Sequence, residues 1–288
     1  MQLSPLFQTR RSTKRVSLGF PVRLGASPIS RALLSIICLV APFVASKGFT
    51  SSADALFRFG TNSFNAGEYV QAAAAFAQAA ALQPSGGTLQ NLGLSDWQCA
   101  RTGPAILAWE QALWVDPFNQ AARINLRFAR RIAQLEAPDL NWAEVVSSWL
   151  PANWWAWVGG ISLWTAVGIS TVPGLLRWRR AAWHQAVAPF SLAMFLLSFP
   201  AQIGINSRSK LGFVLLKDTP LRLTPTAEAQ VITRLAAGEP GRVERTRGNY
   251  LLIRASHTAG WIERKQFQLI SSVPALVPQK PATPSTGG

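Results

Sequence analysis

Few residues in this 288-residue chain could perform catalysis or hold a metal ion. It has two cysteines and two histidines. Cys38 lies in an apolar run near the amino terminus, and Cys99 alone can form neither an internal disulfide nor a zinc site. His184 and His257 fall in different predicted modules, on opposite sides of a predicted membrane. We therefore expect no metal site and no cofactor.

Motifs of common enzyme classes are also lacking. The chain has no H-E-x-x-H, no G-x-S-x-G and no phosphate-binding loop. Its long apolar segments contain no paired carboxylates, and no ionisable side chain that could form a proton or ion path. We expect no catalytic residues and predict a binding protein rather than an enzyme.

Charged residues are absent from two long stretches, residues 154–176 and 186–205. A helix needs about 20 apolar residues to cross a bilayer, and each stretch meets that length. A short basic loop separates them. We interpret residues 151–207 as a transmembrane helical hairpin, in contact with the lipid bilayer. The alternative is a pair of buried helices in a soluble core, where long uncharged helices are rare.

Tryptophans cluster at both ends of the first stretch, and indole rings favour the headgroup region of a membrane. They are Trp149, Trp154, Trp155 and Trp157 at one end, and Trp178 and Trp183 at the other. The segment just before, residues 138–150, is predicted to form a short helix. It is either an interfacial helix lying on the membrane or a capping helix of the preceding domain.

The net charge of +15 comes largely from basic segments that flank the predicted membrane segments. It therefore does not indicate nucleic-acid binding. Residues 1–31 hold six Lys or Arg and no acid, whereas residues 47–144 are nearly neutral. Basic loops stay in the cytoplasm, so the loop with Arg177, Arg179 and Arg180 is predicted to be cytoplasmic. Both soluble modules then lie on the other side. In a bacterium this means an inner-membrane protein with both soluble domains in the periplasm.

The first 46 residues have the pattern of an export signal. A basic region precedes a short apolar run, residues 32–45, and small residues follow it. The segment is either a cleaved signal peptide or a retained anchor. In both cases the next module is predicted to be exported.

Residues 47–137 contain an internal repeat. Five positions recur at a constant offset of 33: Gly60, Ala72, Phe76, Ala79 and Pro84 correspond to Gly93, Ala105, Trp109, Ala112 and Pro117. Such a period, about 34 residues, indicates stacked helix pairs. These residues resemble the tetratricopeptide repeat over residues 53–117, with residues 120–135 as a capping helix. Ala100 and Thr102 depart from the glycine and tyrosine of the first repeat.

The resemblance implies a concave groove, built from the first helix of each pair, that holds peptides or partner helices. The matching positions are Phe57, Thr61, Phe64, Gln90, Leu94, Trp97 and Gln98. For Phe64 and Trp97 the alternative is a place in the core.

Residues 208–270 change to short β-type runs separated by turn residues. The runs are residues 213–216, 221–223, 230–232, 241–245, 250–253 and 260–262. Short strands at regular spacing predict a small barrel. The stretches KDTPLRLTP, RGNYLLIR and GWIERKQF resemble the bacterial SH3 domain. That resemblance implies a ligand-binding aromatic surface at Trp261, which is also a candidate core residue. Residues 271–288 are rich in Pro, Ser and Thr and are predicted to be disordered.

The fold class is therefore a multi-domain membrane protein: an all-α helical repeat, a transmembrane hairpin and a small all-β barrel. This order resembles the BatE-type proteins of bacterial aerotolerance operons. The resemblance implies a membrane-tethered periplasmic scaffold that binds protein partners, among them von Willebrand-type Bat proteins. It implies that the scaffold acts beside a MoxR-type ATPase in envelope stress. The alternative is a peptidoglycan-binding sensor of the cell wall.

Overall fold

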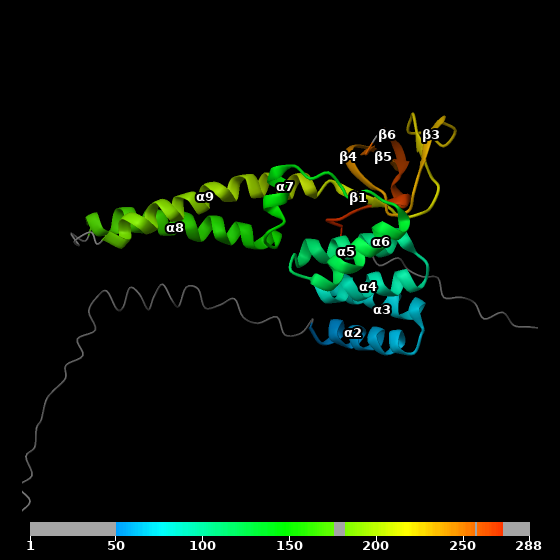
Figure 1. Ribbon diagram of the computed structural model, residues 1–288, viewed down its shortest axis with the longest axis horizontal. Coiled ribbons are helices and arrows are strands. Elements are labelled where there is room, and N and C mark those ends of the chain that lie inside the picture. The colour runs from blue at the N-terminus through cyan, green and yellow to red at the C-terminus, as the bar shows by residue number, and fades with distance from the viewer. Residues whose placement is uncertain (1–49, 176–181, 257, 273–288) are drawn as a thin grey trace, which may run out of the picture. The chain divides into compact units, whose positions relative to one another are not determined.

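The structure is a computed structural model that describes residues 50–175, 182–256 and 258–272. The predicted combination of a helical part and a β part is confirmed, because the described residues form eight α-helices and a seven-stranded antiparallel sheet (Figure 1). The predicted export signal, the arginine loop and the end of the tail lie outside the described residues.

Five consecutive helices make up the first part, and each contacts the next along the chain. They are α2 (Thr50–Asn65), α3 (Tyr69–Leu82), α4 (Gly86–Gln98), α5 (Thr102–Val115) and α6 (Gln120–Ala133). The side chains of Ser85 and Asn119 cap α4 and α6 by accepting backbone N–H bonds. The turns inside the two pairs match as well: Gly67 has φ +78° and Ala100 has φ +58°. Ala100 therefore adopts the left-handed backbone of Gly67, its counterpart in the first repeat.

The repeated glycines lie against the repeated aromatics. Phe76 packs on Gly60, and a Cβ there would come within 2.9 Å of the ring. Trp109 packs in the same way on Gly93, and its Nε1 donates a hydrogen bond to the Gln90 carbonyl at 3.2 Å. Each glycine lets two helices approach closely enough for the ring to fill the space between them.

Two long helices follow the short helix α7 (Trp142–Ser147). Helices α8 (Ala152–Leu175) and α9 (Ala182–Arg208) pack side by side (Figure 1). Small residues allow this approach, since a Cβ on Gly159 would lie 3.0 Å from Ser198 Oγ. Helix α7 packs on α9 at Gly204, where the Ala143 carbonyl occupies the space of a side chain.

One of the described helices is long and apolar enough to cross a membrane, over Ala186–Arg208. Helix α8, the predicted first span, is not among such helices.

The sheet has the strand order β3-β2-β6-β5-β4-β1-β7, and every pair in it is antiparallel. The strands are β1 (Leu211–Val214), β2 (Thr219–Arg222), β3 (Val231–Leu235), β4 (Pro240–Arg247), β5 (Tyr250–Ala255), β6 (Ala259–Glu263) and β7 (Phe267–Leu269). The observed bounds differ from the predicted runs by up to three residues; the first strand, for example, begins at Leu211 rather than Phe213. Strand β7 was not predicted, because so short a strand carries too little pattern.

The helical part and the sheet share buried side chains. Leu211 and Phe213 of β1, together with Ile270, belong to the same core cluster as the helical repeat. Gly103 of α5 lies directly against the carbonyls of Val214 and Leu215. The sheet has a second core of its own beneath β2, β5 and β6. The helices and the sheet are therefore in direct contact through α5 and β1.

Candidate partner-binding surfaces

The residues predicted to line the groove of the repeat fall into two groups. Four apolar side chains are partly buried and pack against the helical core: Phe57, Phe64, Leu94 and Trp97. The three polar residues differ in their exposure. Thr61 donates to the Phe57 carbonyl, Gln90 is half-buried, and Gln98 is exposed. The apolar members of the predicted groove therefore contribute to packing as well as to the surface.

Trp97 lies between the core and an exposed helix face. Its ring is 6.0 Å from Trp109 on one side and 6.0 Å from Phe128 on the other. Phe128 is 53% exposed and lies on α6 between the exposed residues Ile124 and Ile132. Their spacing of four places these three side chains on one face of α6. The motifs did not reveal this apolar stripe, although its period of four is visible in the sequence.

Three arginines follow the same helix one position earlier. Arg123, Arg127 and Arg131 are all exposed and run beside the apolar stripe. Arg130, by contrast, is held in an ion pair with Glu110 of α5. The outward face of α6 is thus both apolar and basic, which suits a partner with apolar and acidic groups.

Trp261 is half-buried on β6, between β2 and β5. It lies opposite Leu252 on one side and Arg222 on the other. The neighbouring edge of the sheet exposes Leu223, Val231 and Ile232. The structure places Trp261 within the sheet, whereas the other predicted groove residues lie on α2 and α4.

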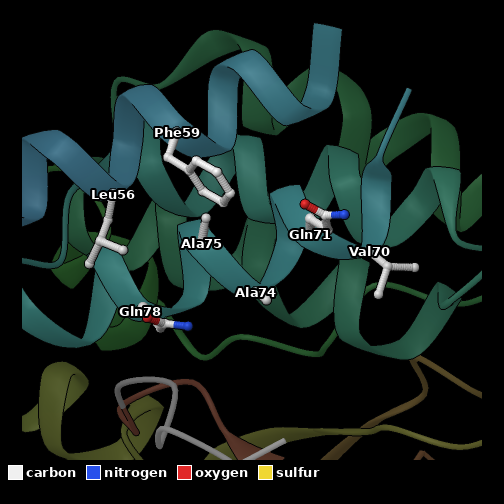
Figure 2. A pocket seen from close by; sticks show the side chains of 7 residues that line it. All are labelled: Leu56, Phe59, Val70, Gln71, Ala74, Ala75 and Gln78. Carbon is white, nitrogen blue, oxygen red and sulfur yellow. The ribbon is translucent and has the colours of Figure 1, made fainter. Parts of the chain in front are cut away.

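An open groove lies on the first helix pair, as Figure 2 shows. It encloses 270 Å³ and is lined by Leu56, Phe59, Val70, Gln71, Ala74, Ala75 and Gln78. Phe59 is 54% exposed, and Val70 is also exposed. None of its lining residues is charged. The sequence did not indicate this groove, because the resemblance to the tetratricopeptide repeat implied binding only on the concave side.

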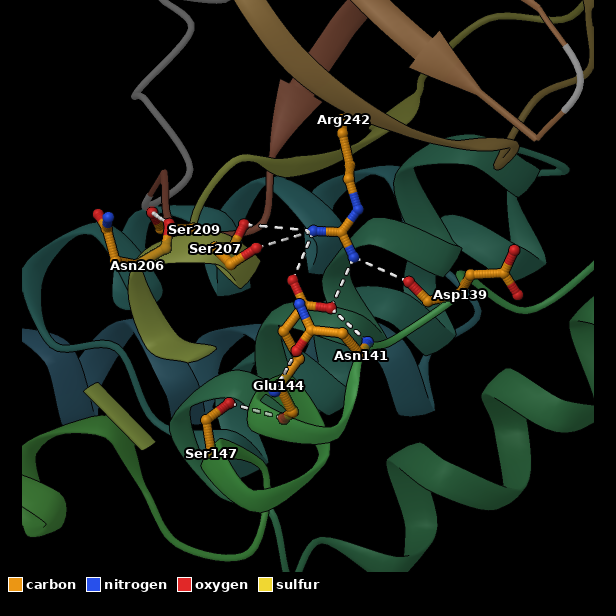
Figure 3. Close-up of polar contacts among 8 residues, drawn as sticks. All are labelled: Asp139, Asn141, Glu144, Ser147, Asn206, Ser207, Ser209 and Arg242. Carbon is orange, nitrogen blue, oxygen red and sulfur yellow. Dashed lines mark hydrogen bonds and ion pairs between the residues drawn. The ribbon is translucent and has the colours of Figure 1, made fainter. Parts of the chain in front are cut away.

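An ion pair between the buried Glu144 and the half-buried Arg242 joins α7 to the sheet (Figure 3). Both oxygens of Glu144 accept from the guanidinium of Arg242 on β4, at 2.5 and 2.7 Å. Arg242 also donates to the Asp139 carbonyl at 2.8 Å and to Ser207 Oγ of α9 at 3.3 Å. Asn141 completes the arrangement through a capping box with Glu144. One guanidinium therefore ties together the segment before α7, the end of α9 and the sheet.

The ionised form of Glu144 is favoured in this setting. Burial acts to raise its pKa, but hydrogen bonds from Arg242, Ser207 and the Asn141 backbone outweigh burial and lower the pKa below 4.5. The polar contacts of the pair that Figure 3 draws all join parts of this chain to one another. We interpret it as a structural joint. No sequence signal pointed to it, because its two partners are far apart along the chain.

Asp96 of α4 is the second carboxylate with an altered pKa. Burial raises its pKa from 3.8 to about 6, and the Arg101 guanidinium at 2.8 Å opposes the rise only in part. The folded protein therefore holds a proton on Asp96 more tightly than the unfolded chain does.

This shift predicts a loss of stability as the pH rises. The contribution is fully present below pH 3.8 and is lost as the pH rises through about 6. Asp96→Asn stays neutral, so its melting temperature should exceed that of the wild type at pH 8 and approach it at pH 4. One pKa unit corresponds to about 1.4 kcal/mol, which makes a gain of about 1–3 kcal/mol reasonable. Asp54→Asn, at an exposed position, is the control. A gain independent of pH would contradict the assignment.

Among residues 50–272, apart from those the structure leaves out, no group of His, Cys, Asp and Glu is suited to hold a metal ion. Comparison with protein-family models, curated proteins and solved structures gives no match for this chain.

Proposed function

We propose that this chain is a membrane-anchored scaffold that binds protein partners through its helical repeat. In this proposal the helices form a tetratricopeptide-type stack and the sheet is an SH3-like module. Helices α8 and α9 are the two spans of a hairpin. Both modules lie in the periplasm of a bacterium, as in the BatE-type proteins that the chain resembles.

The surface of the helix pair supports the anchor. Large apolar side chains point outward along both helices, among them Trp157, Ile161, Trp164, Phe190, Leu196, Phe199 and Ile203. Soluble proteins rarely expose a contiguous apolar surface of this extent. Lipid is the environment in which such a surface is stable.

The repeat geometry supports the tetratricopeptide-type stack. Corresponding glycines, aromatic rings and left-handed turns recur at the constant offset of the internal repeat. Antiparallel short strands around a compact core support the SH3-like module in the same way.

The observation that carries the binding function is the aromatic pair of Trp97 and Phe128. Phe128 is half-exposed between two further exposed apolar residues and is flanked by arginines. Exposed aromatic and arginine side chains contribute much of the binding energy at protein interfaces. A protein partner would remove this apolar surface from water.

Phe128→Ala should therefore weaken capture of membrane partners without unfolding the protein. A hot-spot truncation costs about 2 kcal/mol, or roughly thirtyfold in affinity. The measurement is a pull-down from solubilised membranes, with bound proteins quantified by mass spectrometry. Trp97→Ala should weaken capture too, but should also lower the melting temperature by several degrees, because the ring packs on Trp109.

Phe118→Ala is the matched control, since Phe118 is exposed and lies outside the α6 helix. Capture of every partner by folded Phe128→Ala protein would rule out this surface. Retention of the purified chain by cell-wall sacculi, in place of protein capture, would support the wall-sensor alternative.

A further inference from the structure

Helix α7 has a buried side and an exposed side. Its buried residues are Ala143, Glu144 and Ser147. Trp142 and Val145 are exposed, and so is Trp149, which lies just beyond the end of the helix. Their spacing of three and then four residues places Trp142, Val145 and Trp149 along one side of this segment. The open side of α7 is therefore aromatic and uncharged.

Helix α7 lies at the end of the helix pair where α8 begins and α9 ends (Figure 1). It packs on α9 at Gly204, four residues before that helix ends at Arg208. It is also fixed to α8, because Trp155 Nε1 donates a hydrogen bond to the Ser147 carbonyl at 3.2 Å. In the proposed hairpin, this end of the pair is the level at which the chain enters and leaves the bilayer.

An exposed apolar stripe runs along α8 from the same end. Its members are Trp154, Trp157, Ile161 and Trp164, whose spacing of three, four and three residues places them on one helix face. At 1.5 Å of rise per residue, the stripe is about 15 Å long, roughly half the thickness of the hydrocarbon core. In the proposed hairpin the stripe thus reaches toward the middle of the bilayer, and the exposed side of α7 lies at its outer end.

The chemistry of the exposed side of α7 suits lipid rather than a protein partner. Indole rings favour the headgroup region, and a short amphipathic helix can bury its apolar side at the boundary of headgroups and acyl chains. The chain has no Lys or Arg between residues 132 and 176, so anionic headgroups are not needed for this contact. The main contacts of α7 are with α9, which favours an interfacial helix over a cap of the helical repeat.

We propose that α7 lies in the headgroup region of the bilayer, with Trp142, Val145 and Trp149 facing the lipid. This inference rests on the proposed membrane anchor and adds a second kind of lipid contact to the two spans. It also has a consequence for the sheet. Because Arg242 binds Glu144 of α7, a lipid-bound α7 holds the sheet next to the membrane surface.

The test places one spin label at a time in the full chain, with Cys38 and Cys99 replaced by serine, in phosphatidylcholine nanodiscs. Oxygen concentrates in lipid and a nickel complex stays in water, so their collisions with the label report its depth. Val145→Cys is the test position. Ile161→Cys on α8 is the control for the hydrocarbon core, and Ile132→Cys, exposed on α6, is the control for water. We expect the Val145 label to lie in lipid, at a depth between the two controls.

The tryptophans should be what holds the segment in place. Adding Trp142→Ser and Trp149→Ser should shift the Val145 label toward water. Phe118→Ser, at an exposed aromatic residue outside α7, should leave the depth of the label unchanged. Anionic phosphatidylglycerol in the nanodiscs should also leave it unchanged. Circular dichroism shows whether each variant has kept its helices.

The outcomes separate this inference from the anchor on which it rests. A Val145 label in water beside an Ile161 label in lipid would overturn the inference and leave the anchor standing. Water at both positions would overturn the anchor as well. Exclusion of both reagents from Val145 would assign this side of α7 to a second copy of the chain. An unchanged Val145 depth in the folded double serine variant would refute the role of the tryptophans.

Discussion

Replacing Trp109 by alanine should unfold the helical repeat. The indole is 1% exposed, fills the space above Gly93 and donates to the Gln90 carbonyl. Truncating a buried aromatic side chain to alanine costs about 3–5 kcal/mol, because the surrounding helices cannot close the cavity. Whole domains are stable by only about 5–15 kcal/mol. The loss is thus a large fraction of what holds the repeat together.

Thermal unfolding of the purified chain, followed by circular dichroism, measures this effect. Trp142→Ala is the matched control, since Trp142 is largely exposed on α7. The control should melt within a few degrees of the wild type. A Trp109→Ala protein with an unchanged melting curve would show that the helix pairs are not packed as described.

Arg242→Ala should also lower the stability, by a different mechanism. The Glu144 side chain is fully buried, and Arg242 supplies its counter-charge through two hydrogen bonds. Removing the partner of a buried charge leaves that charge uncompensated, which costs about 3–5 kcal/mol in a fully buried pair and less here, because Arg242 is 30% exposed. Because Arg242 also binds Asp139 and Ser207, the joint between α7, α9 and the sheet should loosen.

The pH dependence distinguishes this mechanism from a simple loss of contacts. In the wild type the pKa of Glu144 is lowered, so its contribution is present above pH 4.5 and is lost as the pH falls. In Arg242→Ala burial should raise the pKa instead. The variant should therefore be most destabilised at neutral pH and recover in part near pH 4.

The exposed pair of Arg254 and Glu244 provides the control. Arg254 is 68% exposed, and surface ion pairs contribute about 0–1 kcal/mol. Arg254→Ala should leave the melting temperature nearly unchanged. If Arg242→Ala behaves in the same way at every pH, the joint does not hold the modules.

The repeat was predictable because its constraints are local and occur twice. Gly60 and Gly93, with Phe76 and Trp109, recur at one offset, and each glycine lies against its aromatic partner. The uncharged stretches and the short β-type runs could be predicted for the same reason, because hydrophobic period and composition are properties of residues that are close together in the sequence.

The joint and the groove could not be predicted in this way. Glu144 and Arg242 meet because α7, α9 and β4 converge, and nothing near either residue marks its partner. The α2–α3 groove depends on how these two helices pack, and no local pattern in the sequence marks it. The sequence could not assign Trp97 to either the core or the surface, because its ring contacts both the buried Trp109 and the exposed Phe128.

The most direct test of the account is the membrane topology of the intact chain. A reporter that is active only outside the cytoplasm is fused after Leu135, at Ala181 or after Ile270. The account predicts activity at Leu135 and Ile270 and none at Ala181, since the arginine loop is expected to stay in the cytoplasm. Activity at Ala181 with silence at the other two positions would contradict the orientation. Activity at all three would contradict the hairpin itself.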